Sequence, residues 1–172
     1  LRIATEGVAM VHNLILGAFT MVGSGVDNWV DGREQRRYTP YHIRHRTEVA
    51  GMMTILHGDN RFYNNIFVQG HPITNEEPKE SPFHQQVGTH VWDEYPTYKE
   101  WIAKFDMDEE KPDMGKLEPA HFSHLPVWAD GNVYLAGAKA WKKEKHNLVK
   151  DDADVQIELV EENGQYKLST NL

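Results

Sequence analysis

Three side chains that could bind a ligand recur at intervals of three positions in the first half of the chain: His42, His45 and Glu48. On a helix this spacing would place two imidazoles and a carboxylate on one face as metal ligands. Pro40 and the strand-like residues that follow Thr47 argue against a helix. We therefore expect a sugar-binding loop in which these three side chains contact hydroxyl groups. A metal site and a solvated basic loop are the alternatives.

Two further carboxylates, Glu6 and Asp59, each stand six or seven positions before an Asn that begins an apolar segment. If they project from strands two steps apart, about 9.6 Å separates them, near the outer limit for an inverting pair of carboxylates. A retaining glycosidase needs carboxylates about 5–5.5 Å apart, on neighbouring strands. If Glu6 is the acid/base of a retaining enzyme, its nucleophile would therefore precede Leu1.

Asp59 and Arg61 follow one another closely in the polar run 57–61, directly before a predicted core strand. Both could contact a sugar, Asp59 as an acceptor and Arg61 as a donor. An ion pair between them that pins the turn is an equally good interpretation.

The elements that would position these residues come from a repeat. Segments 11–17, 64–70 and 131–137 each contain an Asn, three large apolar residues and then a Gly. Asn13 and Asn65 are 52 positions apart, which we interpret as two steps of 26, whereas the 67 positions to Asn132 require an insertion. Repeats of this length are typical of solenoids, and Asn amides can stack from one turn to the next. The sequence thus predicts an all-β solenoid; three ordinary strands are the alternative.

The remaining segments predict local elements. Thr97 and Glu100 form a capping box before an apolar stripe, so we expect a short helix over 97–105 that packs on the core. Alternating residues around Asn163-Gly164 predict a β-hairpin over 155–168. Residues 48–56 form a further strand, and 27–45 and 71–96 are expected to be long loops. The domain prediction is solenoid turns with loop insertions over 1–150 and an appended hairpin over 151–172, with the chain cut at both ends.

Composition narrows the class of ligand. The 172 residues include 26 acidic and 18 basic ones, a net charge of −8, which argues against a nucleic-acid or anionic-membrane partner. Cysteine is absent, which excludes disulfides and a thiolate metal site or nucleophile. The apolar run 14–23 is too short to span a bilayer. Five Trp, seven Tyr and ten His suit uncharged polar ligands such as sugars.

Four segments together resemble the β-xylosidases of glycoside hydrolase family 120: residues 6–15, 38–51, 57–68 and 127–135. The resemblance implies the C-terminal portion of a right-handed parallel β-helix that carries an inserted β-sandwich elsewhere in the protein. It also implies cleavage of xylosides with retention, through an Asp nucleophile and a Glu acid/base. Glu6 matches the acid/base by position, and the nucleophile would belong to the preceding turn, outside this chain.

We therefore expect a retaining glycosidase that cleaves β-xylosides or related short plant-polysaccharide oligosaccharides. Glu6 would be catalytic, the substrate-binding residues would be His42, His45, Glu48, Asp59 and Arg61, and no cofactor or metal is expected. The expected partners are an oligosaccharide substrate and the rest of the same β-helix, with a homo-oligomer possible and either a cytoplasmic or a secreted location. A glycan-binding scaffold without activity and a β-helix polysaccharide lyase are the alternatives.

Overall fold

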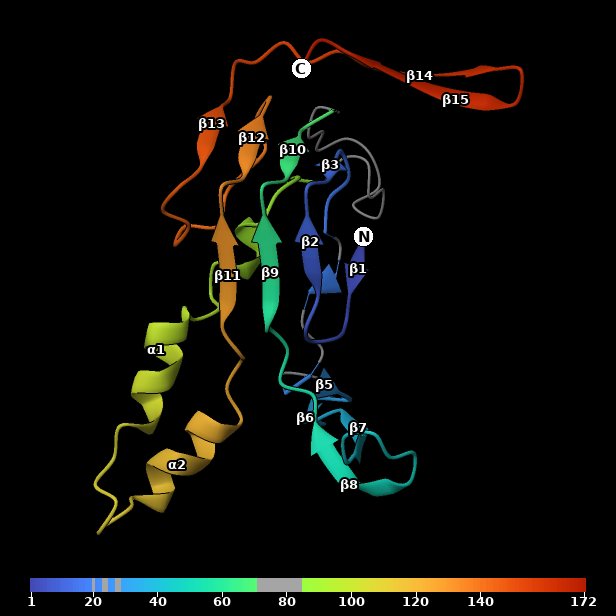
Figure 1. Ribbon diagram of the computed structural model, residues 1–172. Coiled ribbons are helices and arrows are strands. Elements are labelled where there is room, and N and C mark those ends of the chain that lie inside the picture. Colours follow the sequence, from blue (N-terminus) through green and yellow to red (C-terminus); the bar gives the residue numbers. More distant parts are fainter. Residues whose placement is uncertain (20, 23–24, 27–28, 71–84) are drawn as a thin grey trace.

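A computed structural model describes residues 1–172 apart from 20, 23–24, 27–28 and 71–84, and parallel sheets form its body (Figure 1). In the smallest sheet, β1 (Arg2–Ile3) pairs with β4 (Met21–Val22). A second sheet has the order β11-β9-β2, built from β2 (Ala9–Val11), β9 (Asn60–Tyr63) and β11 (Val127–Asp130). The third has the order β13-β12-β10-β3, built from β3 (Leu14–Ile15), β10 (Ile66–Val68), β12 (Val133–Leu135) and β13 (Leu148–Lys150).

Hairpins and helices are attached to this body. The hairpins are β5–β6 (Trp29–Val30 and Arg33–Glu34), β7–β8 (Tyr38–His42 and Val49–Thr54) and β14–β15 (Ile157–Glu162 and Gln165–Thr170). The helices are η2 (His90–Trp92), α1 (Tyr98–Ile102), η3 (Ala103–Phe105) and α2 (Met114–His121). Figure 1 shows α1 and α2 beside the start of β11, while β14–β15 extends away from the body.

The prediction of an all-β, right-handed parallel β-helix is wrong. The described residues form separate small parallel sheets, antiparallel hairpins and helices, which is a mixed α/β architecture without a solenoid. The physical reason lies in the repeat interval: Leu14 pairs directly with Ile66, so the 52 positions from one to the other make one step and not two. The described residues between β3 and β10 include two hairpins, and those between β10 and β12 include the helices η2, α1, η3 and α2.

The three repeated Asn residues nevertheless stack in register. Asn65 Oδ1 accepts hydrogen bonds from the backbone N–H and the side-chain amide of Asn13, both at 3.0 Å. Asn132 Oδ1 accepts the same pair of bonds from Asn65, again at 3.0 Å. Asn65 and Asn132 are completely buried or nearly so, and a buried amide is stable only when its polar atoms are bonded. The ladder thus fixes the register of β3, β10 and β12.

A carboxylate ends the ladder. Glu144 Oε1 accepts from the backbone N–H of Asn132 at 3.2 Å and from its side-chain amide at 2.8 Å. Glu144 Oε2 accepts from the hydroxyl of Tyr134 at 2.7 Å, and that hydroxyl also bonds Thr89 Oγ1 at 2.7 Å. Burial raises the pKa of Tyr134 far above its usual range. The polar side-chain atoms of Asn132, Tyr134 and Glu144 therefore all have partners inside the protein.

Aromatic side chains fill the space beneath the sheets. Phe62 from β9 lies 4.5 Å from Trp92, and Phe67 from β10 stacks on Tyr134 with ring centroids 5.0 Å apart and planes 5° from parallel. Phe19 meets Trp92 edge-on at 4.8 Å. These rings are almost wholly removed from water. Stacked and edge-on pairs add specific attraction to the gain from burial, so this cluster is the core of the described chain.

The local predictions have mixed outcomes. The hairpin around Asn163-Gly164 and the capping box of Thr97 and Glu100 are confirmed. No residue of α1 is buried, so the prediction that its apolar stripe packs on the core is wrong.

The predicted loop over 27–45 contains strands of two hairpins, because Asp31 and Gly32 take the positive φ angles of a tight turn, 52° and 72°. Pro40 is tolerated in β7 because that sheet has only two strands. Most of the loop expected over 71–96 lies outside the described residues; the remainder includes η2. Within the described chain, no helix has the length and apolarity needed to cross a membrane.

Replacing Asn65 with Ala should destabilise the protein by about 3 kcal/mol, because a lost buried partner costs roughly 1–3 kcal/mol for each group left unbonded. Urea unfolding would measure the change. Asn147→Ala is the matched control, since Asn147 is exposed. Equal stabilities for the two variants would contradict the structural role of the ladder.

Replacing Glu144 with Ala should also destabilise the protein, by about 2–3 kcal/mol, because it removes the acceptor of Asn132 and Tyr134. Glu144→Gln should cost less, since an amide oxygen can still accept from Asn132. Thermal unfolding of the two variants would test this order, and a larger loss for Gln than for Ala would contradict it.

Candidate functional site

Glu6, the predicted acid/base, lies where the chain approaches the start of β9. It forms a parallel bridge with Gly58, and the N–H of the adjacent Gly7 donates to Gly58 O at 3.1 Å. Glu6 is half-buried, and its Oε2 accepts the backbone N–H of Leu56 at 3.1 Å. The carboxylate is thus oriented by a backbone donor and still reaches solvent.

The close approach opposite Glu6 depends on glycine. Gly58 has a φ of +98°, and a Cβ there would lie 2.2 Å from the carbonyl oxygen of Leu125. No other residue fits this position without displacing the backbone of Leu125. The absence of a side chain at Gly58 therefore allows this segment to pack closely between the Glu6 segment and the chain that leads into β11.

Glu6 and Asp59 are closer than their spacing in the sequence suggested. Because Glu6 pairs with Gly58 directly, the backbone segments are one strand apart, about 4.8 Å, and not two strands apart at about 9.6 Å. Asp59 Oδ2 lies over Gly7, 3.6 Å from where a Cβ on that glycine would be. The predicted two-step separation is wrong, because strands about 52 positions apart pair directly.

The ion pair proposed for Asp59 and Arg61 is confirmed. Arg61 Nη1 lies 2.9 Å from Asp59 Oδ1 and donates to the backbone oxygen of Asp59 at 2.8 Å. The guanidinium carbon of Arg61 also sits 4.4 Å from the ring centroid of Trp128. Arg61 therefore links the Asp59 turn to an aromatic ring on the neighbouring strand. Direct contact of Asp59 or Arg61 with a sugar stays a prediction.

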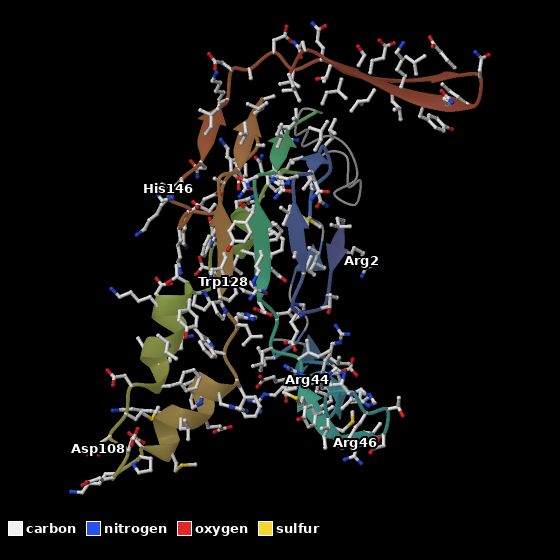
Figure 2. All side chains as sticks on the ribbon, in the orientation of Figure 1. Arg2, Arg44, Arg46, Asp108, Trp128 and His146 are labelled. Carbon is white, nitrogen blue, oxygen red and sulfur yellow. The ribbon has the colours of Figure 1, made fainter. Side chains whose placement is uncertain are left out.

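His42, His45 and Glu48 lie together on the exposed β7–β8 hairpin, at its connecting end. His42 Nδ1 hydrogen-bonds the backbone oxygen of Glu48 at 3.2 Å, and Glu48 forms an ion pair with Arg46. The pKa of Glu48 is lowered, first by a hydrogen bond from its own backbone N–H and then by Arg46. Figure 2 shows Arg44 and Arg46 on this hairpin, well apart from Trp128 and His146. Among the described residues, no hydrogen bond or ion pair joins these three side chains to Asp59 or Arg61.

The alternative of a metal site on the hairpin finds no support in the described residues. None of their His, Asp and Glu side chains form a group of three or more arranged to hold an ion. As sugar-binding residues, His42, His45 and Glu48 stay predictions.

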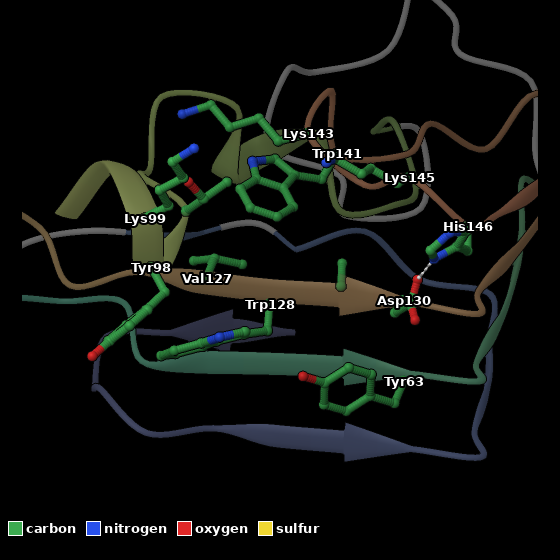
Figure 3. Close-up of a pocket in the computed structure, with 12 residues that line it drawn as sticks. Tyr63, Tyr98, Lys99, Val127, Trp128, Asp130, Trp141, Lys143, Lys145 and His146 are labelled. Atoms are coloured by element: carbon green, nitrogen blue, oxygen red, sulfur yellow. Dashed lines mark hydrogen bonds and ion pairs between the residues drawn. The ribbon is translucent and has the colours of Figure 1, made fainter. Parts of the chain in front are cut away.

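A hollow of about 470 Å³, which we call the β11 pocket, lies over β9 and β11 beside α1 (Figure 3). Its aromatic walls are Tyr63, Tyr98, Trp128 and the buried Trp141. Tyr98 is 53% exposed, and its ring lies nearly parallel to Trp128, with centroids 6.4 Å apart. Tyr63 and Trp128 are half-buried. The pocket thus offers aromatic surface that reaches solvent.

Charged groups surround this aromatic surface. Three of them are the lysines Lys99, Lys143 and Lys145, and the others are Asp130 and His146, joined at 2.9 Å. Lys143 Nζ donates to Glu100 Oε2 and to the backbone oxygen of Tyr95, each at 2.8 Å. The hydrogen bond from Lys143, and next the backbone N–H of Thr97, lower the pKa of Glu100 to about 2.

The sequence analysis does not predict the β11 pocket. Trp128 and Asp130 lie in segment 127–135 of the family resemblance, and Tyr98 belongs to the apolar stripe over 97–105 that is expected to pack on the core. The alternation in β11, with Val127 buried and Trp128 partly exposed, is a signal that could have marked Trp128 as a surface aromatic.

Comparison with known proteins shows that the chain is similar, in fold and in sequence, to part of a sugar-bound protein of known structure. That protein is XylC, solved in complex with xylose; the chain is 33% identical to it, with a TM-score of 0.69. The match covers 99% of this chain and 23% of XylC, so the chain spans less than a quarter of that protein's length. No family profile and no curated protein sequence matches the chain.

The Glu100–Lys143 pair predicts a specific acid dependence. Because the pKa of Glu100 is lowered, the stabilisation from its ionised form is present above about pH 4.5 and is lost as the pH falls through about 2. An NMR titration should give Glu100 a pKa near 2, and Lys143→Met should raise it towards 4.5. A pKa that does not move in the variant would contradict the assigned cause.

Proposed function

We propose that this chain is part of a retaining glycoside hydrolase that acts on β-xylosides. The observation that carries the proposal is the similarity to XylC, which binds xylose, over nearly the whole of this chain. At 33% identity the similarity extends beyond the fold to the side chains. The sequence's resemblance to family 120 β-xylosidases supports the same substrate class.

Glu6 is the proposed acid/base. It would protonate the leaving oxygen in the first step and activate water in the second. Its position supports this role, since the carboxylate reaches solvent and is oriented by the N–H of Leu56. A partner carboxylate about 5–5.5 Å away is required for retention, which is close to one strand spacing.

The nucleophile is proposed to lie in a part of the longer protein that precedes Leu1. Asp59 is also one strand from Glu6, but its carboxylate is paired with Arg61 and covers Gly7. Those contacts suit a residue that holds the turn and is not free to attack a sugar.

Hydrolysis of an aryl β-D-xyloside by the full-length protein tests the role of Glu6. Glu6→Gln should lower kcat/KM by about 10²–10⁴-fold, the usual contribution of a general acid/base. Glu6→Ala with a dinitrophenyl xyloside, whose leaving group needs no protonation, should regain activity with azide and give the β-xylosyl azide. Glu158→Gln, a change on the exposed β14 strand, is the matched control and should leave the rate unchanged.

Unchanged kcat/KM in Glu6→Gln would remove Glu6 from the mechanism, and no hydrolysis of any aryl glycoside by the folded protein would refute the glycosidase. Trapping with a 2-deoxy-2-fluoro xyloside, followed by peptide mass spectrometry, would locate the nucleophile. A label on Asp59 would contradict its assignment to the turn.

A further inference from the structure

We propose that the β11 pocket binds a sugar that carries a carboxylate, such as a glucuronic acid residue. This proposal goes beyond the glycosidase and does not depend on it, because binding in the pocket is measurable without any turnover. It rests on the aromatic surface, the charges and the size of the pocket.

The aromatic surface fits the apolar face of a pyranose ring. Sugars stack their C–H faces on Trp and Tyr rings, burying apolar surface while their hydroxyls stay free to bond. Arg61 on β9 and Tyr98 on α1 both pack against Trp128 and orient its ring. Tyr63 extends the surface along β9, as Figure 3 shows.

The charges around the rings favour an anion. Three lysines line the pocket against one carboxylate, Asp130, in a chain whose net charge is −8. Lys143 is paired with Glu100, but Lys99 and Lys145 have no ion-pair partner among the described residues. Opposite charges attract strongly only when they come close, so a ligand carboxylate within the pocket would gain most from an ammonium group that is not already paired.

The two ends of the pocket have different chemistry. Figure 3 shows Lys99 and Lys143 projecting towards one end, and the Asp130–His146 pair at the other. A carboxylate oxygen of Asp130 can accept from sugar hydroxyls while it holds His146. A hexuronate would thus place its carboxylate near Lys99, at the end opposite Asp130, with its ring on Trp128 and its hydroxyls near Asp130.

The size and net charge argue against larger or more highly charged ligands. About 470 Å³ lies within the range of small-molecule sites, roughly 300–1,000 Å³. A nucleotide could also stack and bind lysines, but its phosphate carries more negative charge towards an acidic protein. A single carboxylate therefore fits the pocket better.

Calorimetric titration of the full-length protein with methyl β-D-glucuronide and methyl β-D-glucoside tests the proposal. These ligands differ only in the carboxylate, and the glucuronide should bind about tenfold more tightly at low salt, with a smaller preference at high salt. Lys99→Gln combined with Lys145→Gln should abolish the preference. Lys167→Gln, on the exposed β15 strand, should keep it.

Trp128→Ala should weaken binding of both sugars about tenfold or more, whereas Trp128→Phe should retain part of the affinity. Equal affinity of the two sugars for the unmodified protein, or a preference that survives the double lysine change, would overturn the proposal. Tighter binding of adenosine monophosphate, in competition with the glucuronide, would assign the pocket to nucleotides and would overturn it as well.

Discussion

The stack of Asn13, Asn65 and Asn132 is the interaction on which the rest of the described structure depends. Asn65 and Asn132 each accept, through Oδ1, from the backbone N–H and the side-chain amide of the preceding Asn, so a single buried group aligns two strands at once. Inside the protein, where water cannot replace a lost bond, this alignment is strongly favoured over any shifted register. The apolar triplets that follow each Asn then pair in parallel and carry Phe67 and Tyr134 into the core.

The register set by the ladder extends to the functional surface. β9 lies between β2 and β11, with Arg61 opposite Ala9 on one side and Trp128 on the other. Arg61 contacts Asp59 at the start of β9 and Trp128 across the strand. Asp59, near the proposed catalytic Glu6, is thereby connected to the aromatic wall of the β11 pocket by one side chain. Any change in strand register would break this connection.

The sequence predicts an element of this structure well when the contacts that form it join residues close together in the chain. The capping box of Thr97 and Glu100 and the turn at Asn163-Gly164 involve residues a few positions apart, and both are confirmed. The step from Asn13 to Asn65 is not predictable, because nothing in the sequence marks whether these 52 positions form one connection or two. The β11 pocket combines Tyr63, Tyr98, Trp128 and Trp141 from four separate segments, so no local spacing could reveal it.

The long connections between paired strands give the architecture an unusual freedom. Register is fixed by amides at the ends of β2, β9 and β11, and not by the length of chain between them. The entropy cost of closing a loop rises only slowly with its length. The β7–β8 hairpin and the α1–α2 segment can therefore be lengthened, shortened or exchanged in evolution or by engineering while the framework stays unchanged, which makes them natural positions for diversifying what the protein recognises.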